Sequence, residues 1–177
     1  LGKHNLHGGA NGISAQNWKF VAVSKDEAVL EVRCPDGNMG FPGNLDVRAT
    51  YRLSGKGVIS VTLEAVTDAP TVCNLSHHSY FNLEDGGRSS ILDHALQINA
   101  AAYTPVDESL IPDGRVLPVA GTDFDFRQSR KIRRAQDGTQ VVYDCNFCLS
   151  AARSEDLRLA ARVQAPGSGI AMECWTG

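Results

Sequence analysis

Two adjacent histidines, His77 and His78, lie in a segment, Asn74–Leu83, whose residues alternate in character. In an extended strand, alternate side chains point to opposite faces of a sheet. The alternation therefore predicts a strand with His77 on a largely apolar side and His78 on a side where every residue can form hydrogen bonds. We expect His78 to face a polar cleft, where an imidazole can give or take a proton near neutral pH. The residues alone leave open a second reading of His78, as a hydrogen-bonded histidine on a sheet face.

Two further polar clusters could take part in binding. His7 directly precedes Gly8 and Gly9, and glycines allow close backbone approach and positive φ. His7 could therefore lie at the lip of a pocket, or it could cap a surface turn. Asp144 and Asn146 alternate with neighbours of another kind, so a strand would place both on one side. This pair is suited to holding hydroxyl groups, although such residues are also common where strands begin.

The histidines and cysteines do not predict a metal site. Adjacent residues of a strand face opposite ways, so His77 and His78 cannot chelate one ion, and His4 and His7 have no carboxylate or cysteine at a suitable spacing. Cys145 and Cys148 form a single CxxC motif without a second pair, which is too little for zinc or redox chemistry. Phosphate-binding loops are also missing, because no glycine-rich turn connects a strand to a helix with a lysine.

Composition is that of an ordinary soluble globular protein: 42% of the 177 residues are hydrophobic and 21% are charged. The net charge of −3 provides no general attraction to nucleic acid or to anionic membranes. No apolar run approaches the ~18 residues of a membrane helix. Five scattered cysteines suit reduced thiols in a reducing compartment, so we expect a cytoplasmic protein. The basic run from Arg127 to Arg134 lacks interleaved aromatic residues and is interpreted as a solvated face.

The dominant hydrophobic period is two, which is typical of strands. It is clearest at residues 45–53 and 59–65, which the loop Ser54–Gly57 separates, so these two strands should pair as a hairpin. The same alternation returns at residues 96–100, 157–163 and 170–174, with Gly- and Pro-rich turns between. No segment shows four turns of helical spacing. The sequence thus predicts an all-β chain, an antiparallel sandwich or barrel, that forms one domain over residues 1–177.

Taken together, the polar clusters resemble the aldose 1-epimerase (galactose mutarotase) family. The similarity spans nearly the whole chain, and the matching segments run in the order of the family. They are Asn5–Gly9 with Trp18 after it, Pro35–Gly37 through Gly40–Leu45, Asn74–Leu83, Tyr103–Val106, Leu110–Gly114, Gly121–Arg127 and Tyr143–Phe147.

The resemblance implies a large antiparallel β-sandwich of the galactose mutarotase type that binds a free aldose in an open cleft without metal or cofactor. His78 would be the general acid that protonates the ring oxygen of the sugar. His7 would bind near the same oxygen, and Asp144 would hold sugar hydroxyls. A carboxylate base would remove the anomeric proton, so that the ring opens and recloses as the other anomer. The implied partner is a small-molecule hexose such as galactose or glucose, with neither nucleic acid nor membrane involved.

Departures from the family pattern lead us to expect an internal fragment that carries the acid but not the base and is poorly active or inactive alone. The family's arginine would fall before Leu1, and its catalytic glutamate would fall after Gly177, so the N- and C-terminal strands would be missing. Glu173 matches a structural position and is no substitute. Cys145 stands where the family usually has a histidine.

Two rival functions stay open. A hexose-6-phosphate 1-epimerase would need arginines around a phosphate, for which Arg127, Arg130, Arg133 and Arg134 are candidates. A non-catalytic carbohydrate-binding domain would keep Asp144 but would not need His78.

Overall fold

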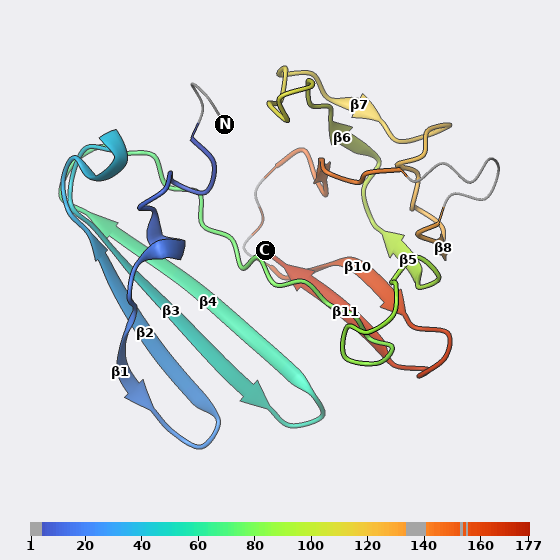
Figure 1. Ribbon diagram of the computed structural model, residues 1–177, viewed down its shortest axis with the longest axis horizontal. Helices are drawn as coiled ribbons and strands as arrows, with labels where there is room; N and C mark the ends of the chain where they lie inside the picture. The colour runs from blue at the N-terminus through green and yellow to red at the C-terminus, as the bar shows by residue number, and fades with distance from the viewer. Residues whose placement is uncertain (1–4, 134–140, 153, 155) are drawn as a thin grey trace. The chain divides into compact units, whose positions relative to one another are not determined.

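The computed structural model describes residues 5–133, 141–152, 154 and 156–177, and these residues are almost entirely strands and loops (Figure 1). The helical elements among them are two 3₁₀ turns, η1 (Ile13–Ala15) and η2 (Asn38–Gly40). All strand pairs are antiparallel. The predicted all-β antiparallel class is confirmed. No helix in this part of the chain has the length and apolar character needed to cross a bilayer.

The chain groups into two compact units, Leu1–Ser79 and Tyr80–Gly177, which are described separately. Because the chain groups into two units, our expectation of one domain over residues 1–177 stays a prediction. His4, Arg134 and the turn-like residues 136–138 lie outside the described residues.

The first unit is built on one four-stranded sheet whose order follows the chain. Its strands are β1 (Lys19–Val23), β2 (Glu27–Cys34), β3 (Leu45–Ser54) and β4 (Val58–Thr67). The predicted hairpin is confirmed: β3 and β4 pair along their full length, ending at Ser54 opposite Val58. Lys56 and Gly57 in the connecting turn have positive φ, the left-handed conformation that such tight turns require.

The two faces of this sheet differ in chemistry. On one face, Val32 lies opposite Val47 and both are buried. On the other face, Arg48 lies opposite Glu31 and forms an ion pair with it across β2 and β3. Since successive side chains of a strand alternate between faces, this pattern separates an apolar face from a charged face. The pocket described below is lined by residues of the apolar face.

The second unit contains two smaller sheets. One has the order β11-β10-β5-β8 and the other β7-β6-β9. Their strands are β5 (Ala95–Ile98), β6 (Ala102–Thr104), β7 (Leu117–Pro118), β8 (Arg130–Lys131), β9 (Asn146–Cys148), β10 (Arg158–Gln164) and β11 (Ala171–Thr176). Phe126, which is 1% exposed, is central to the core of this unit. The Arg130 guanidinium lies 3.7 Å from the centre of its ring.

The predicted strand over residues 74–82 is wrong. This segment is irregular, and no strand is found between β4 and β5. His77 is therefore not directed to a core by sheet alternation. It is exposed, its ring contacts Tyr51 at a centroid distance of 5.7 Å, and its Nε2 lies 3.0 Å from Ser79 Oγ. Alternation is a local pattern, whereas a strand also needs a neighbour for its backbone hydrogen bonds, and none of the described strands pairs with this segment.

Candidate functional site

His7 occupies a tight turn whose geometry depends on the glycines after it. The Gly9 amide donates to the Leu6 carbonyl at 2.9 Å, and His7 and Gly8 between them have φ of 54° and 81°. Positive φ at both central residues defines a type I′ turn. Gly8 and Gly9 thus have the positive φ that we predicted for these glycines. The sequence did not indicate that His7 itself would be left-handed, a conformation uncommon for residues other than glycine.

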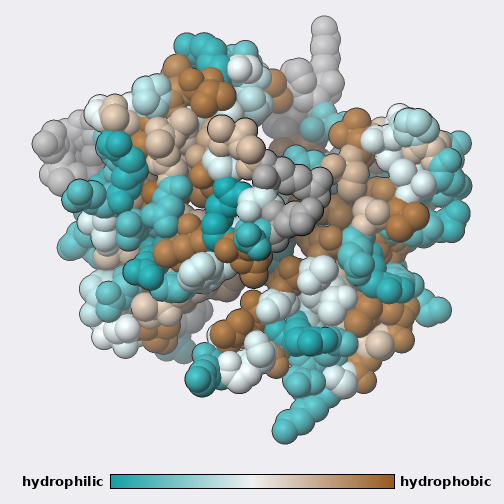
Figure 2. Space-filling model, turned by 180° about the vertical axis from the view of Figure 1, so that it is seen from behind, coloured by the Kyte–Doolittle hydropathy of each residue, from teal (hydrophilic) through white to brown (hydrophobic). Residues whose placement is uncertain are grey.

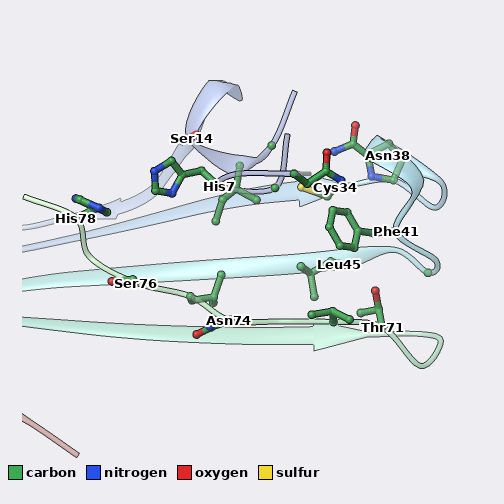
Figure 3. Close-up of a pocket in the computed structure, with 18 residues that line it drawn as sticks. His7, Ser14, Cys34, Asn38, Phe41, Leu45, Thr71, Asn74, Ser76 and His78 are labelled. Carbon is green, nitrogen blue, oxygen red and sulfur yellow. The ribbon is translucent and has the colours of Figure 1, made fainter. Parts of the chain in front are cut away.

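The structure brings His7 and His78 together. Their rings meet edge to face, with centroids 5.3 Å apart and an interplanar angle of 89°. Both side chains are exposed, and both line a pocket with a volume of about 650 Å³. Figure 3 shows the two imidazoles next to each other at one end of this pocket, away from Phe41 and Asn38. His7 comes from the loop before β1, and His78 comes from the irregular segment after β4.

The pocket has a neutral lining of mixed polarity. Asn5, Asn74 and Ser76 contribute amide and hydroxyl groups, and Phe41 and Leu45 contribute apolar surface. Apart from the two histidines, the described lining has no side chain that ordinarily carries charge. A few polar groups on an otherwise apolar concave surface are typical of small-molecule sites. This lining is suited to a neutral ligand with several hydroxyl groups, and apart from the two histidines its described residues offer no cation for a phosphate.

A buried thiol also lines the pocket. Cys34 at the end of β2 is buried, and burial raises the pKa of its thiol, an effect that a hydrogen bond with the Asn38 side chain opposes. Desolvation disfavours a thiolate, so Cys34 presents a neutral thiol to the pocket at neutral pH.

Asp144 lies in the second unit, directly before the residues that lead into β9. Asp144 and Asn146 are exposed, whereas Tyr143 and Phe147 are partly buried and contact the ring of Phe126 at 5.1 and 6.4 Å. The alternation predicted for Asp144 and Asn146 is therefore present. Cys145 between them has a raised pKa, first through burial and then through the negative charge of Asp144. Asp144 belongs to a different unit from the two histidines.

The basic run after Phe126 forms ion pairs within the second unit. Arg127 binds Asp125 at 2.7 Å and holds the pKa of that carboxyl at about 2. Arg133 and Lys131 both bind Asp93, and hydrogen bonds from these cations, that of Arg133 first, lower the pKa of this carboxyl.

The remaining arginine described in this run is used in packing. Arg130 lies over Phe126 and donates to the carbonyls of Asp123 and Asp125. The interpretation of a solvated face thus holds for the exposed Arg127, Lys131 and Arg133, but it missed the packed guanidinium of Arg130.

Possible metal ligands and the carboxylate of Glu173 can also be located in the structure. In the described part of the chain, no cluster of three or more His, Cys, Asp or Glu side chains could hold a metal ion. Glu173 lies on β11, where it forms an ion pair with Arg162 at 2.8 Å and accepts a hydrogen bond from Trp175.

Sequence reasoning missed the residues that support the His7 turn. The Asn11 side-chain amide donates to Asn38 Oδ1, the Asn38 side-chain amide donates to the Asn11 backbone carbonyl, and the Gln16 amide donates to Asn11 Oδ1 at 2.6 Å. Trp18 Nε1 donates to the Ile13 carbonyl at 2.9 Å. These residues are separated by up to 27 positions in sequence, so no local pattern could have paired them. The only available signal was the density of amide side chains near the His-Gly-Gly segment.

Known proteins resemble this chain over its whole length. The aldose 1-epimerase family model matches residues 1–177. A galactose mutarotase from Sus scrofa is 40% identical over 176 residues, which are 99% of this chain and 50% of that protein. An aldose 1-epimerase from Escherichia coli K12 is 37% identical over 180 residues, or 99% of this chain and 51% of that protein. The chain thus spans about half the length of these relatives.

Solved structures agree with this result. The chain superposes on an aldose epimerase homologue from C. elegans with a TM-score of 0.86 and 25% identity, covering 97% of this chain and 52% of that one. A galactose 1-epimerase from Lactobacillus acidophilus gives a TM-score of 0.73 and 34% identity, covering 91% and 48%. By the match of the family model to all of its residues, the chain belongs to the aldose 1-epimerase family.

Proposed function

We propose that the protein is an aldose 1-epimerase that interconverts the α- and β-anomers of a free hexose such as galactose or glucose. The observation that carries the proposal is the His7–His78 ring pair, 5.3 Å apart, at a pocket with a neutral lining in a chain of this family. Galactose mutarotase and aldose 1-epimerase are the names of relatives with 37–40% identity.

In the proposed reaction, His78 is the general acid. A base removes the proton of the C1 hydroxyl, the electron pair forms the C1=O bond, and the C1–O5 bond breaks as O5 takes a proton from His78. Rotation about the C1–C2 bond and the reverse steps then give the other anomer. The balance requires two proton-transfer groups and no cofactor. The family resemblance implies a carboxylate base, for which we assign no residue of this chain.

The other two site residues are assigned to binding. His7 lies beside His78, so it can donate a hydrogen bond near the same ring oxygen. Asp144 would accept hydrogen bonds from sugar hydroxyls, since a carboxylate accepts at two oxygens. We further propose that the protein works in the cytoplasm on a small-molecule aldose, and that neither nucleic acid nor membrane is a partner.

A matched pair of variants tests the assignment. Mutarotation of fresh α-D-galactose by the protein as its gene encodes it is followed by polarimetry. We expect His78→Gln to lower kcat by about 10²–10⁴-fold, the usual contribution of a general acid. The neighbouring His77→Gln is the control, because His77 contacts Tyr51 and Ser79 and does not line the pocket. Equal loss in both variants would refute the special role of His78.

Two further measurements separate the rival functions. Faster turnover of hexose 6-phosphate than of hexose would point to a phosphate-specific epimerase, although Arg127, Arg130 and Arg133 are already engaged within the second unit. Calorimetric sugar binding that persists in His78→Gln, without turnover by the unaltered protein, would point to a non-catalytic binding domain.

A further inference from the structure

The His7 turn is held against η2 by two different contacts. The first is polar: the Asn11 side-chain amide donates to Asn38 Oδ1 at 3.3 Å, and the Asn38 amide donates to the Asn11 carbonyl at 3.0 Å. Asn38 is partly buried and lines the pocket, whereas Asn11 is exposed. These two bonds join residues 27 positions apart, at the loop before β1 and the connection between β2 and β3.

The second contact is steric and involves the next residue of η2. The Met39 side chain lies so close to Gly9 that a Cβ added to Gly9 would overlap it. A Cβ on Gly12 would likewise overlap the carbonyl oxygen of His7. The loop is therefore folded tightly onto its own histidine on one side and onto Met39 on the other. At Gly12 the neighbouring atoms belong to the backbone, so the close approach requires glycine, whereas at Gly9 it is the positive φ of 87° that favours glycine.

Other hydrogen bonds of this loop are local. Gly9 bonds to Leu6, Gly12 to Gly9 and Ala15 to Gly12 through the backbone. Two hydrogen bonds, both with Asn38, join this loop to η2, which lies in a distant part of the chain. A residue other than glycine with positive φ persists only where its surroundings hold it. Asn38 and Met39 thus provide external support for the conformation of His7, in addition to its ring contact with His78.

We propose that Asn38 and Met39 are positioning residues that hold the imidazole of His7 beside His78. This inference rests on the proposed function, because the position of His7 matters to turnover only if the pair acts on a sugar. Neither residue needs to contact the reacting atoms. Asn38 acts through Asn11, and Met39 acts through Gly9. Small displacements of such groups cost activity, because a misplacement of about 1 Å can slow a reaction by 10²-fold.

A double-mutant cycle tests the polar contact. We expect Asn38→Ala and Asn11→Ala each to lower kcat for mutarotation by about ten- to a hundredfold, with a smaller change in KM. The double variant should be no slower than Asn38→Ala alone, because Asn38→Ala already removes both bonds, whereas Asn11→Ala removes only the bond donated by the Asn11 side chain. Asn38→Asp, which keeps an acceptor for the Asn11 amide, should recover part of the rate. If Asn38→Ala fails to fold, Asn11→Ala removes the bond from the Asn11 side chain to Asn38 Oδ1 from the exposed side.

Asn44→Ala is the matched control. Asn44 lies in the same connection and binds Asp68 through its backbone and side-chain nitrogens, but among the described residues its hydrogen bonds do not reach the His7 loop and it does not line the pocket. We expect a lower Tm in Asn44→Ala and a kcat within about twofold of the unaltered protein. Equal losses of kcat in Asn38→Ala and Asn44→Ala, after correction for the folded fraction, would show a merely structural role.

A readout without turnover separates this inference from the proposed function. In histidine-labelled protein, an NMR cross-relaxation signal should join the His7 and His78 rings and should disappear in Asn38→Ala but not in Asn44→Ala. Loss of this signal in Asn38→Ala, in a protein that shows no mutarotase activity, would support positioning and refute the function. A preserved signal and an unchanged kcat in Asn38→Ala would overturn the positioning.

Discussion

The side chains of the adjacent residues His77 and His78 contact different parts of the protein. His77 packs on Tyr51 of β3 and bonds to Ser79, whereas His78 meets His7 at the pocket. Adjacent residues in an irregular segment can still point in different directions, as they would in a strand. This separation makes His77→Gln a suitable control for His78→Gln, because the two substitutions alter the same segment.

Thiol reactivity provides a test of the cysteine environments. Burial raises the pKa of Cys34 and of Cys145, so less of each thiol is present as the reactive thiolate at neutral pH. Cys73 and Cys174 are exposed. We expect iodoacetamide to label Cys73 and Cys174 first, and Cys34 and Cys145 several-fold more slowly, as measured by peptide mass spectrometry over time. Early labelling of Cys34 would contradict the buried environment of that thiol.

Among the elements, the β3–β4 hairpin was predictable and the segment 74–82 was not. The hairpin has its signals within one stretch of sequence: alternation in both strands and a glycine-containing turn between them. Segment 74–82 shows the same alternation, but a strand also requires a partner from elsewhere in the chain. Likewise, the closeness of His7 and His78 could be expected only from the family resemblance, and the contact of Asn11 with Asn38 had no signal beyond the density of amide side chains near the His-Gly-Gly segment.

The connection between β4 and β5 is anchored at its end by a buried histidine. His94 is 2% exposed, its Nε2 accepts a hydrogen bond from the Leu83 amide at 3.2 Å, and its carbonyl accepts one from Ile132. His94 Nδ1 is buried and has no partner among the described residues. The His94 imidazole fills space in the core, and its hydrogen bond fixes the backbone at Leu83, at the end of the segment that begins with Asn74 and carries His78.

Substitution of His94 should therefore destabilise the protein far more than substitution of His77. We expect His94→Ala to lower the free energy of unfolding by about 2–4 kcal/mol, through the cavity and the lost acceptor for the Leu83 amide. His77→Ala, at an exposed site, should change it by less than about 0.5 kcal/mol. Urea denaturation of both variants measures the difference. Similar midpoints would mean that the buried imidazole contributes little.

Much apolar surface is exposed in the described part of the chain. The face shown in Figure 2 has hydrophobic residues at the surface among hydrophilic ones. In the first unit, the apolar face of the sheet is covered at Val47 and Ala49 but is open toward the β3–β4 turn, where Leu53 and Ile59 are 57% and 62% exposed. Leu53 and Ile59 lie opposite each other in the register and so form a continuous surface. β4 is moreover an edge strand of this sheet.

Exposed apolar residues on an edge strand favour association, so the 177-residue chain alone should self-associate as its concentration rises. Two adjacent substitutions on β4 test the cause. Ile59→Lys places a charge on the apolar face and should weaken association, whereas Ser60→Lys places the same charge on the opposite face, beside Arg52, and should leave it nearly unchanged. Sedimentation velocity over a range of concentrations measures the effect. A chain that stays monomeric throughout, or two variants that behave alike, would show that this apolar face does not drive association.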